Sequence, residues 1–127
     1  MPTIRVAVCD DARAVKFFLR QVLEEEGDIE VVSATSTGEE ALVELGDCRA
    51  DVLLLDLVLP DVPEPAMLVD RIRAATPQTA IVLISNLPPF SLEKEAERLA
   101  TDGWVPKAAT PAQLREAVRT AMRAASG

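Results

Sequence analysis

The chain has 127 residues, of which 49% are hydrophobic and 27% charged, so it has the size and composition of one soluble globular domain. No apolar run approaches the roughly 20 residues that a membrane-spanning helix needs. The first residues also lack the basic and apolar regions of a secretory signal. These observations predict a protein that makes no contact with a membrane.

Acidic residues outnumber basic ones by 21 to 13, which gives a net charge of −8. Direct binding to nucleic acid usually needs a basic stripe, because neutralised phosphates supply much of the affinity. The arginines are scattered here, so we expect no direct contact with nucleic acid and favour a metal ion or a basic protein surface as partner. Histidine is absent, and the two cysteines, Cys9 and Cys48, lack the spacing of a zinc site. With so few cysteines, the reducing cytoplasm is the expected compartment.

Taken in chain order, short apolar runs alternate with segments of helical periodicity. Strands are expected at residues 4–9, 29–34, 51–56, 80–85 and 103–105. Helices are expected at residues 12–26, 37–45, 66–75, 92–100 and 111–125. Gly27 and Gly46 are the expected stops of the first two helices, and Ser91 and Thr110 are the expected N-caps of the last two. Pro106 cannot donate a hydrogen bond to a sheet, so the fifth strand is expected at an edge.

The alternation of strand and helix predicts an α/β fold of the doubly wound class, in which helices cover both faces of a parallel sheet. The run between Asp51 and Asp56 is apolar throughout, as expected of a central parallel strand. In such a sheet the functional site forms at the carboxyl ends of the strands. Polar residues stand at four of these ends, and they are Asp10, Asp11, Asp56, Ser85 and Lys107.

Three carboxylates at one edge of a sheet repel one another. At ~4 Å and an effective dielectric constant of ~20, each pair costs on the order of 4 kcal/mol, so the cluster needs a cation. Oxygen ligands without histidine or cysteine suit Mg²⁺. With a lysine and a serine hydroxyl nearby, one aspartate is placed to attack phosphorus and form an acyl phosphate.

At this point the sequence resembles the receiver domain of two-component response regulators, of the chemotaxis-receiver type, over residues 4–125. The residues that carry the resemblance are Asp10 and Asp11, Asp56 within Asp-Leu-Val-Leu-Pro, Ser85, Trp104 and Lys107. The resemblance implies a flavodoxin-like, five-stranded parallel sheet in the order 2-1-3-4-5 with five helices. It also implies that residues 1–127 form a single receiver domain.

The resemblance implies a role for each of these residues. Asp56 would accept a phosphoryl group from a histidine kinase or a phosphotransfer protein. The residues implied to hold Mg²⁺ are Asp10, Asp11, Asp56 and, through its backbone carbonyl, Val58. Ser85 and Lys107 would contact the phosphoryl group as part of the catalytic set, and Trp104 would occupy the aromatic switch position.

The sequence departs from the receiver pattern at several positions. Ala108 follows the lysine where proline is common, and residues 63–65, Pro-Glu-Pro, replace a glycine-containing loop, which we expect to be stiffer. Trp104 is bulkier than the usual tyrosine or phenylalanine, which puts the usual switching motion in doubt. The resemblance implies that the residues at positions 58 and 87 help to orient a hydrolytic water. The apolar side chains of Val58 and Leu87 cannot hydrogen-bond this water, which predicts slow loss of the phosphoryl group.

The favoured function is a phosphorylatable signalling switch, not an enzyme, without an effector domain in this chain. Its output would pass to a downstream protein target through the fourth helix, fifth strand and fifth helix. Alternatives are a receiver segment cut from a larger regulator or hybrid kinase, a phosphate relay or sink, and a degenerate receiver that only binds partners. An aspartyl-phosphate hydrolase is disfavoured, since Val58 stands where its second aspartate would be. A flavodoxin-like cofactor carrier is disfavoured, since Asp10 and Asp11 would repel its phosphate.

Overall fold

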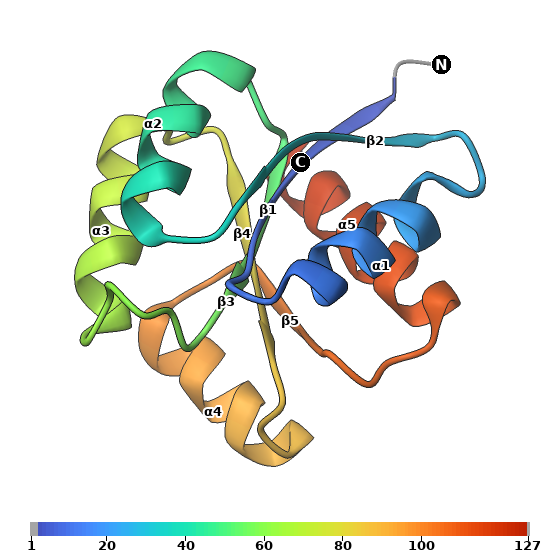
Figure 1. The fold of residues 1–127 in the computed structure, drawn as a ribbon. Helices are drawn as coiled ribbons and strands as arrows, with labels where there is room; N and C mark the ends of the chain where they lie inside the picture. The colour runs from blue at the N-terminus through green and yellow to red at the C-terminus, as the bar shows by residue number, and fades with distance from the viewer. Residues whose placement is uncertain (1–2, 127) are drawn as a thin grey trace.

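Five parallel strands form one sheet in the order β2-β1-β3-β4-β5 in the computed structural model, which describes residues 3–126 (Figure 1). The strands are β1 (Ile4–Cys9), β2 (Ile29–Thr35), β3 (Val52–Asp56), β4 (Ala80–Ser85) and β5 (Gly103–Pro106). The helices are α1 (Arg13–Glu24), α2 (Gly38–Cys48), α3 (Pro65–Ala75), α4 (Pro89–Leu99) and α5 (Pro111–Ser126). The flavodoxin-like fold and the edge position of β5 are therefore confirmed.

The helices lie in two layers, with α1 and α5 on one face of the sheet and α2, α3 and α4 on the other (Figure 1). Strand residues alternate between these layers, because successive side chains of a strand point to opposite faces. On β3, Leu54 packs with the α1 and α5 layer, whereas Leu53 and Leu55 pack with the opposite layer. Every residue of β3 is buried, as its apolar sequence predicts.

The largest errors in the predicted boundaries, of three residues each, lie at the end of α2 and at the start of α4. Helix α2 does not stop at Gly46 but continues to Cys48, and Arg49 then adopts the left-handed conformation with φ 51°. The guanidinium of Arg5 donates to the backbone oxygens of Cys48 at 2.7 Å and Arg49 at 3.3 Å. These long-range hydrogen bonds satisfy carbonyls that a helix end leaves without partners, so the glycine is not needed as the stop.

Helix α4 begins at Pro89, before the predicted N-cap Ser91, which therefore lies inside the first turn. Proline suits the first helical position because its fixed φ is already helical and its missing N–H is not needed there. Helix α1 ends at Glu24, two residues before its predicted end, and Gly27, with φ +83°, lies in the turn that follows. The predicted N-cap of α5 is confirmed, because Thr110 Oγ1 accepts from the Gln113 amide at 3.1 Å. None of the helices over residues 3–126 combines the length and apolar character needed to cross a membrane.

Candidate functional site

The three predicted carboxylates lie together at the carboxyl ends of β1 and β3. Asp10, Asp11 and Asp56 each offer an oxygen atom within 4.8 Å of the others. Asp10 is fully buried and Asp56 is 5% exposed, whereas Asp11 lies at the surface. The fold positions them in this way because β1 and β3 are neighbouring parallel strands that end at the same edge of the sheet.

Lys107 comes from the end of β5 and reaches two of these carboxylates. Its Nζ lies 2.7 Å from Asp10 Oδ2 and 3.2 Å from Asp56 Oδ2. Burial disfavours the charged form of Lys107, but the close contact with the Asp10 carboxylate and the negative charges of Asp56 and Asp10 outweigh burial and raise its pKa. The Lys107 amide also donates to the Ser85 carbonyl at 2.9 Å, which fixes the start of its side chain. Lys107 is therefore a permanent positive charge at the site.

Asp56 uses both carboxylate oxygens in hydrogen bonds. Oδ1 accepts from the Val58 amide at 3.2 Å, and Oδ2 accepts from Lys107 at 3.2 Å. Burial, with the charge of Asp10, raises the pKa of Asp56 despite the opposing effects of Val58 and Lys107. The hydrogen bonds from Val58 and Lys107 therefore do not fully offset the free-energy cost of burying the ionised Asp56 carboxylate.

Asp10 keeps unused hydrogen-bonding capacity. Its Oδ1 accepts from the Ala12 amide at 2.8 Å. Its Oδ2 is buried, and no described residue gives it a partner with hydrogen-bond geometry, although the Lys107 ammonium lies close enough to form an ion pair. Three carboxylates thus face one ammonium group. This all-oxygen donor set with an excess of negative charge fits Mg²⁺, which binds through one or two carboxylates and keeps several waters.

Ser85 ends β4, beside β3, and is 3% exposed. Its Oγ accepts from the Leu87 amide at 3.1 Å, which leaves the hydroxyl proton free to be donated to an anion. Val58 is 72% exposed, and its backbone lies beside the phosphoacceptor, because its amide donates to Asp56 Oδ1. Leu87 is 38% exposed.

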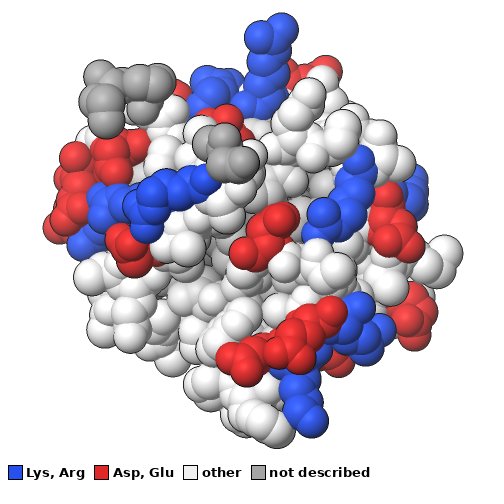
Figure 2. Space-filling model, turned by 180° about the vertical axis from the view of Figure 1, so that it is seen from behind, with Lys and Arg blue, Asp and Glu red and all other residues white. Residues whose placement is uncertain are grey.

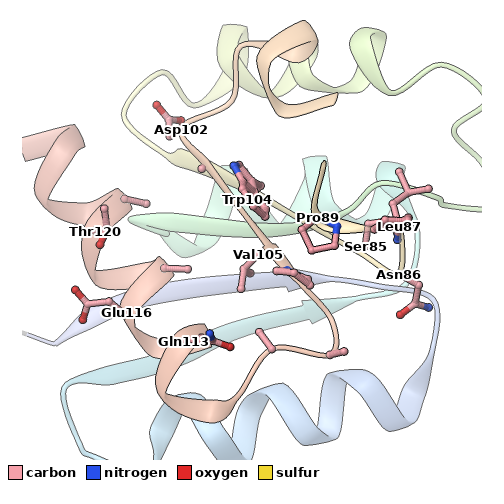
Figure 3. Close-up of a pocket in the computed structure, with 17 residues that line it drawn as sticks. Ser85, Asn86, Leu87, Pro89, Asp102, Trp104, Val105, Gln113, Glu116 and Thr120 are labelled. Atoms are coloured by element: carbon pink, nitrogen blue, oxygen red, sulfur yellow. Dashed lines mark hydrogen bonds between the residues drawn. The ribbon is translucent and has the colours of Figure 1, made fainter. Parts of the chain in front are cut away.

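Trp104 lies apart from the carboxylates in the described contacts. Its half-buried ring packs with the core layer that contains α4. It lines a groove of about 930 Å³ between the loop that follows β4, strand β5 and helix α5, together with Ser85 and the α5 residues Gln113, Glu116 and Thr120 (Figure 3). The structure therefore brings together the acidic residues and Lys107, and places Trp104 in a neighbouring groove that Ser85 also borders.

One contact near the site was not predicted. Asp61, in the loop between β3 and α3, accepts hydrogen bonds from the backbone amides of Gly38 and Glu39 at the start of α2. The sequence holds no local signal for this pairing, because Asp61 is separated from Gly38 by 23 positions.

The comparisons with known proteins agree on one family. The family model described as the response regulator receiver domain matches residues 6–119. Response regulator protein VraR from Staphylococcus aureus is 27% identical over 127 residues, covering 98% of this chain and 59% of VraR. The chain thus spans about three fifths of the length of the curated relatives that it matches.

Two solved structures show the same similarity in three dimensions. The signal receiver domain of NarL from Mycobacterium tuberculosis has a TM-score of 0.85 at 25% identity, covering 100% of this chain and 99% of that one. The REC domain of AraT from Geobacillus stearothermophilus has a TM-score of 0.81 at 30% identity, covering 98% and 96% of the two chains.

Proposed function

The chain belongs to the response regulator receiver domain family, and from this premise we propose that it is a phosphoacceptor of a two-component phosphorelay. Asp56 is the proposed phosphorylation site. The observation that supports it best is the position of its buried carboxylate. Asp56 Oδ2 accepts a hydrogen bond from Lys107 at 3.2 Å, and Asp56 lies within metal-binding reach of Asp10 and Asp11. Receiver domains are signalling domains rather than classical enzymes, and response regulators take their phosphoryl group from histidine kinases or phosphotransfer proteins.

The proposed reaction is a single displacement at phosphorus. A carboxylate oxygen of Asp56 forms the new O–P bond while the P–N bond of a donor phosphohistidine breaks, and the donor imidazole leaves with the electron pair. Lys107 offsets negative charge on the transferred group, and the Ser85 hydroxyl donates a hydrogen bond to one of its oxygens. Burial of Asp56 limits access of bulk water to the carboxylate.

Mg²⁺ is the proposed cofactor. Asp10, Asp11, Asp56 and the Val58 carbonyl would hold it, and it would supply positive charge to the phosphoryl oxygens. This assignment is supported by the buried Asp10 Oδ2, which has spare acceptor capacity, and by the one ammonium group that faces three carboxylates.

The phosphorylation proposal is tested by mass spectrometry after incubation with acetyl phosphate and Mg²⁺. The native chain should gain one phosphoryl group, and the Asp56→Asn variant should gain none. Asp51→Asn is a matched control, since Asp51 lies at the opposite end of β3 and should not affect the gain. A native chain that stays unmodified with acetyl phosphate and with phosphorylated donor proteins would overturn the proposal.

Output is proposed to pass through protein contacts on the face of α4, β5 and α5, which includes the groove beside Trp104 (Figure 3). We propose residues 1–127 as one receiver domain, with a relay or sink role and a place in a larger regulator or hybrid kinase as the alternatives. A relay or sink needs no output surface. Substitutions in the groove that abolish signalling but leave phosphorylation unchanged would therefore favour the switch.

Proteins are the proposed partners, rather than nucleic acid or a membrane, and the cytoplasm is the proposed compartment. The net charge of −8 supports this proposal, because it opposes the approach of phosphate-rich surfaces. On the face seen in Figure 2, Lys and Arg side chains lie beside Asp and Glu instead of gathering in a basic stripe.

A further inference from the structure

The loop between β3 and α3, residues 57–64, is hydrogen-bonded to the first turn of α2 through Asp61. Asp61 Oδ1 accepts from the Gly38 amide at 2.9 Å, and Oδ2 accepts from the Glu39 amide at 3.1 Å. The first amides of a helix have no partner within the helix, and the helix dipole favours a negative charge there. These hydrogen bonds also lower the pKa of Asp61, so it is ionised at neutral pH.

Helix α2 already has its own N-terminal cap, so Asp61 does more than complete the helix. Thr37 Oγ1 accepts from the Glu40 amide at 3.1 Å, and Glu40 Oε1 accepts from the Thr37 amide at 3.0 Å. This local capping box leaves the amides of Gly38 and Glu39, which Asp61 takes from a distant part of the chain. The contact therefore joins α2 to the loop that follows the phosphoacceptor.

Packing around Gly38 shows how closely the loop and the helix approach. A Cβ atom at Gly38 would lie 2.6 Å from Val62 Cγ2 and 3.1 Å from Leu68 Cδ2. Only glycine allows this approach without a shift of these neighbours. The carboxylate of Asp61 and the side chain of Val62 thus hold the loop against the start of α2.

The same loop carries the backbone of Val58, three residues before Asp61. Val62 donates to the Leu59 carbonyl at 3.2 Å, which closes a turn, and Leu57 and Leu59 are buried. On the other side, the Val58 amide donates to Asp56 Oδ1 at 3.2 Å. The Val58 backbone is therefore held on one side by the Asp56 carboxylate and on the other by the turn that contains Asp61.

We propose that Asp61 is a positioning residue that holds the Val58 backbone where its carbonyl can bind Mg²⁺. The proposal rests on the proposed function, since it assigns Val58 to the metal site. Asp61 itself does not contact the metal or the phosphoryl group. Its two hydrogen bonds fix the loop before the metal arrives, so that little ordering of the backbone is needed on binding.

The test compares Mg²⁺ affinity and loop order in four forms of the full chain: native, Asp61→Ala, Asp61→Asn and Glu64→Ala. Glu64→Ala is the matched control, because it removes the same charge from the same loop at an exposed residue without a capping hydrogen bond. Amide NMR shifts followed during Mg²⁺ titration give the dissociation constant. Hydrogen exchange of the Gly38 and Glu39 amides in metal-free protein reports the contact directly.

Asp61→Ala should raise the Mg²⁺ dissociation constant about tenfold relative to Glu64→Ala, as loss of an outer-shell residue does at other metal sites. It should also speed hydrogen exchange at Gly38 and Glu39. Asparagine offers one acceptor oxygen in place of two, so Asp61→Asn should lie between the native chain and Asp61→Ala. If Asp61→Ala does not fold, the smaller loss of Mg²⁺ affinity expected for Asp61→Asn still tests the proposal.

Two results would overturn the assignment of Asp61. One is faster exchange at Gly38 with an unchanged Mg²⁺ dissociation constant, which would make Asp61 a helix cap only. The other is an equal loss of Mg²⁺ affinity in Asp61→Ala and Glu64→Ala, which would show that only the lost negative charge matters. Failure of the proposed function looks different, because the native chain would then bind Mg²⁺ but gain no phosphoryl group. A native chain that binds no Mg²⁺ would overturn both.

Discussion

The Lys107 ammonium lies closer to Asp10 than to the proposed phosphoacceptor, at 2.7 Å from Asp10 Oδ2 and 3.2 Å from Asp56 Oδ2. Asp10 is fully buried, so Lys107 is its main charge partner among the described residues. The lysine and a bound Mg²⁺ would therefore act on the same carboxylates. The effect of removing Lys107 on stability should therefore depend on whether Mg²⁺ is present.

Lys107→Met keeps the length of the side chain but removes its charge. Without Mg²⁺, we expect the free energy of unfolding to fall by about 3 kcal/mol, because a buried carboxylate loses its partner. Mg²⁺ should restore more stability to the variant than to the native chain, since it binds only the folded state and supplies the missing charge. Urea unfolding with and without Mg²⁺ measures both effects. Equal stability of the two proteins at every Mg²⁺ concentration would contradict this arrangement.

The raised pKa of Asp56 predicts a dependence of stability on pH. Burial, with the charge of Asp10, raises this pKa above its unfolded value, so the folded state binds the proton more tightly. Without Mg²⁺, the ionisation of Asp56 then removes stability as the pH rises from the ordinary aspartate value through the raised one. The Asp56→Asn variant cannot ionise, so it should be more stable than the native chain at neutral pH. This advantage should shrink as the pH falls.

Mg²⁺ provides the internal control for that comparison. The native chain should gain stability with increasing Mg²⁺, whereas Asp56→Asn, which lacks one charged ligand, should gain less. At neutral pH and high Mg²⁺ the native chain should therefore be the more stable of the two proteins. Thermal unfolding over a range of pH and Mg²⁺ concentrations checks both statements. A native chain that is the more stable form in metal-free buffer at neutral pH would show that Lys107 fully compensates the burial of Asp56.

Much of this fold could be predicted from the sequence because its strands are short apolar runs that end in polar residues. The run between Asp51 and Asp56 identifies a strand buried on both faces, and β3 is that strand. The convergence of Asp10 and Asp56 follows from parallel strands that end at one edge of the sheet. The strand order came from the family resemblance, because periodicity does not say which strands are neighbours.

Two of the failures have the same physical cause, a contact between distant parts of the chain. Gly46 did not stop α2, because Arg5 on β1 binds the carbonyls at the end of that helix. Asp61 went unnoticed for the same reason, since its hydrogen bonds are to amides of α2. Ser91 is different, because the pair of prolines before it already starts α4. A local pattern shows which residues suit a helix end, but not which distant side chain reaches it.

Val58 and Leu87 predict a long-lived phosphorylated state. Their backbone amides donate to Asp56 and Ser85, the two residues are 72% and 38% exposed, and neither side chain can hydrogen-bond water. The double variant Val58→Asn, Leu87→Glu should lose its phosphoryl group several-fold faster, because amide and carboxylate groups can hold an attacking water. The decay of phosphorylated protein after removal of the donor gives both rates. Met67→Gln, which changes an exposed apolar side chain on α3, is a control that should leave the rate unchanged.

Trp104 offers a direct test of whether the site and the groove communicate. It is the only tryptophan in the chain, it is half-buried, and it shares the groove with Ser85 (Figure 3). If the Ser85 hydroxyl turns to a bound phosphoryl group, the loop that follows β4 and borders the groove should shift, and the surroundings of the indole should change. Emission from Trp104 should then change when Mg²⁺ and beryllofluoride are added to the native chain. The same additions to Asp56→Asn should have no effect, and Ser85→Ala should bind the phosphoryl analogue with a smaller change in emission. An unchanged spectrum in a native chain shown by mass spectrometry to accept a phosphoryl group would mean that Trp104 is a fixed wall of the groove and not a switch.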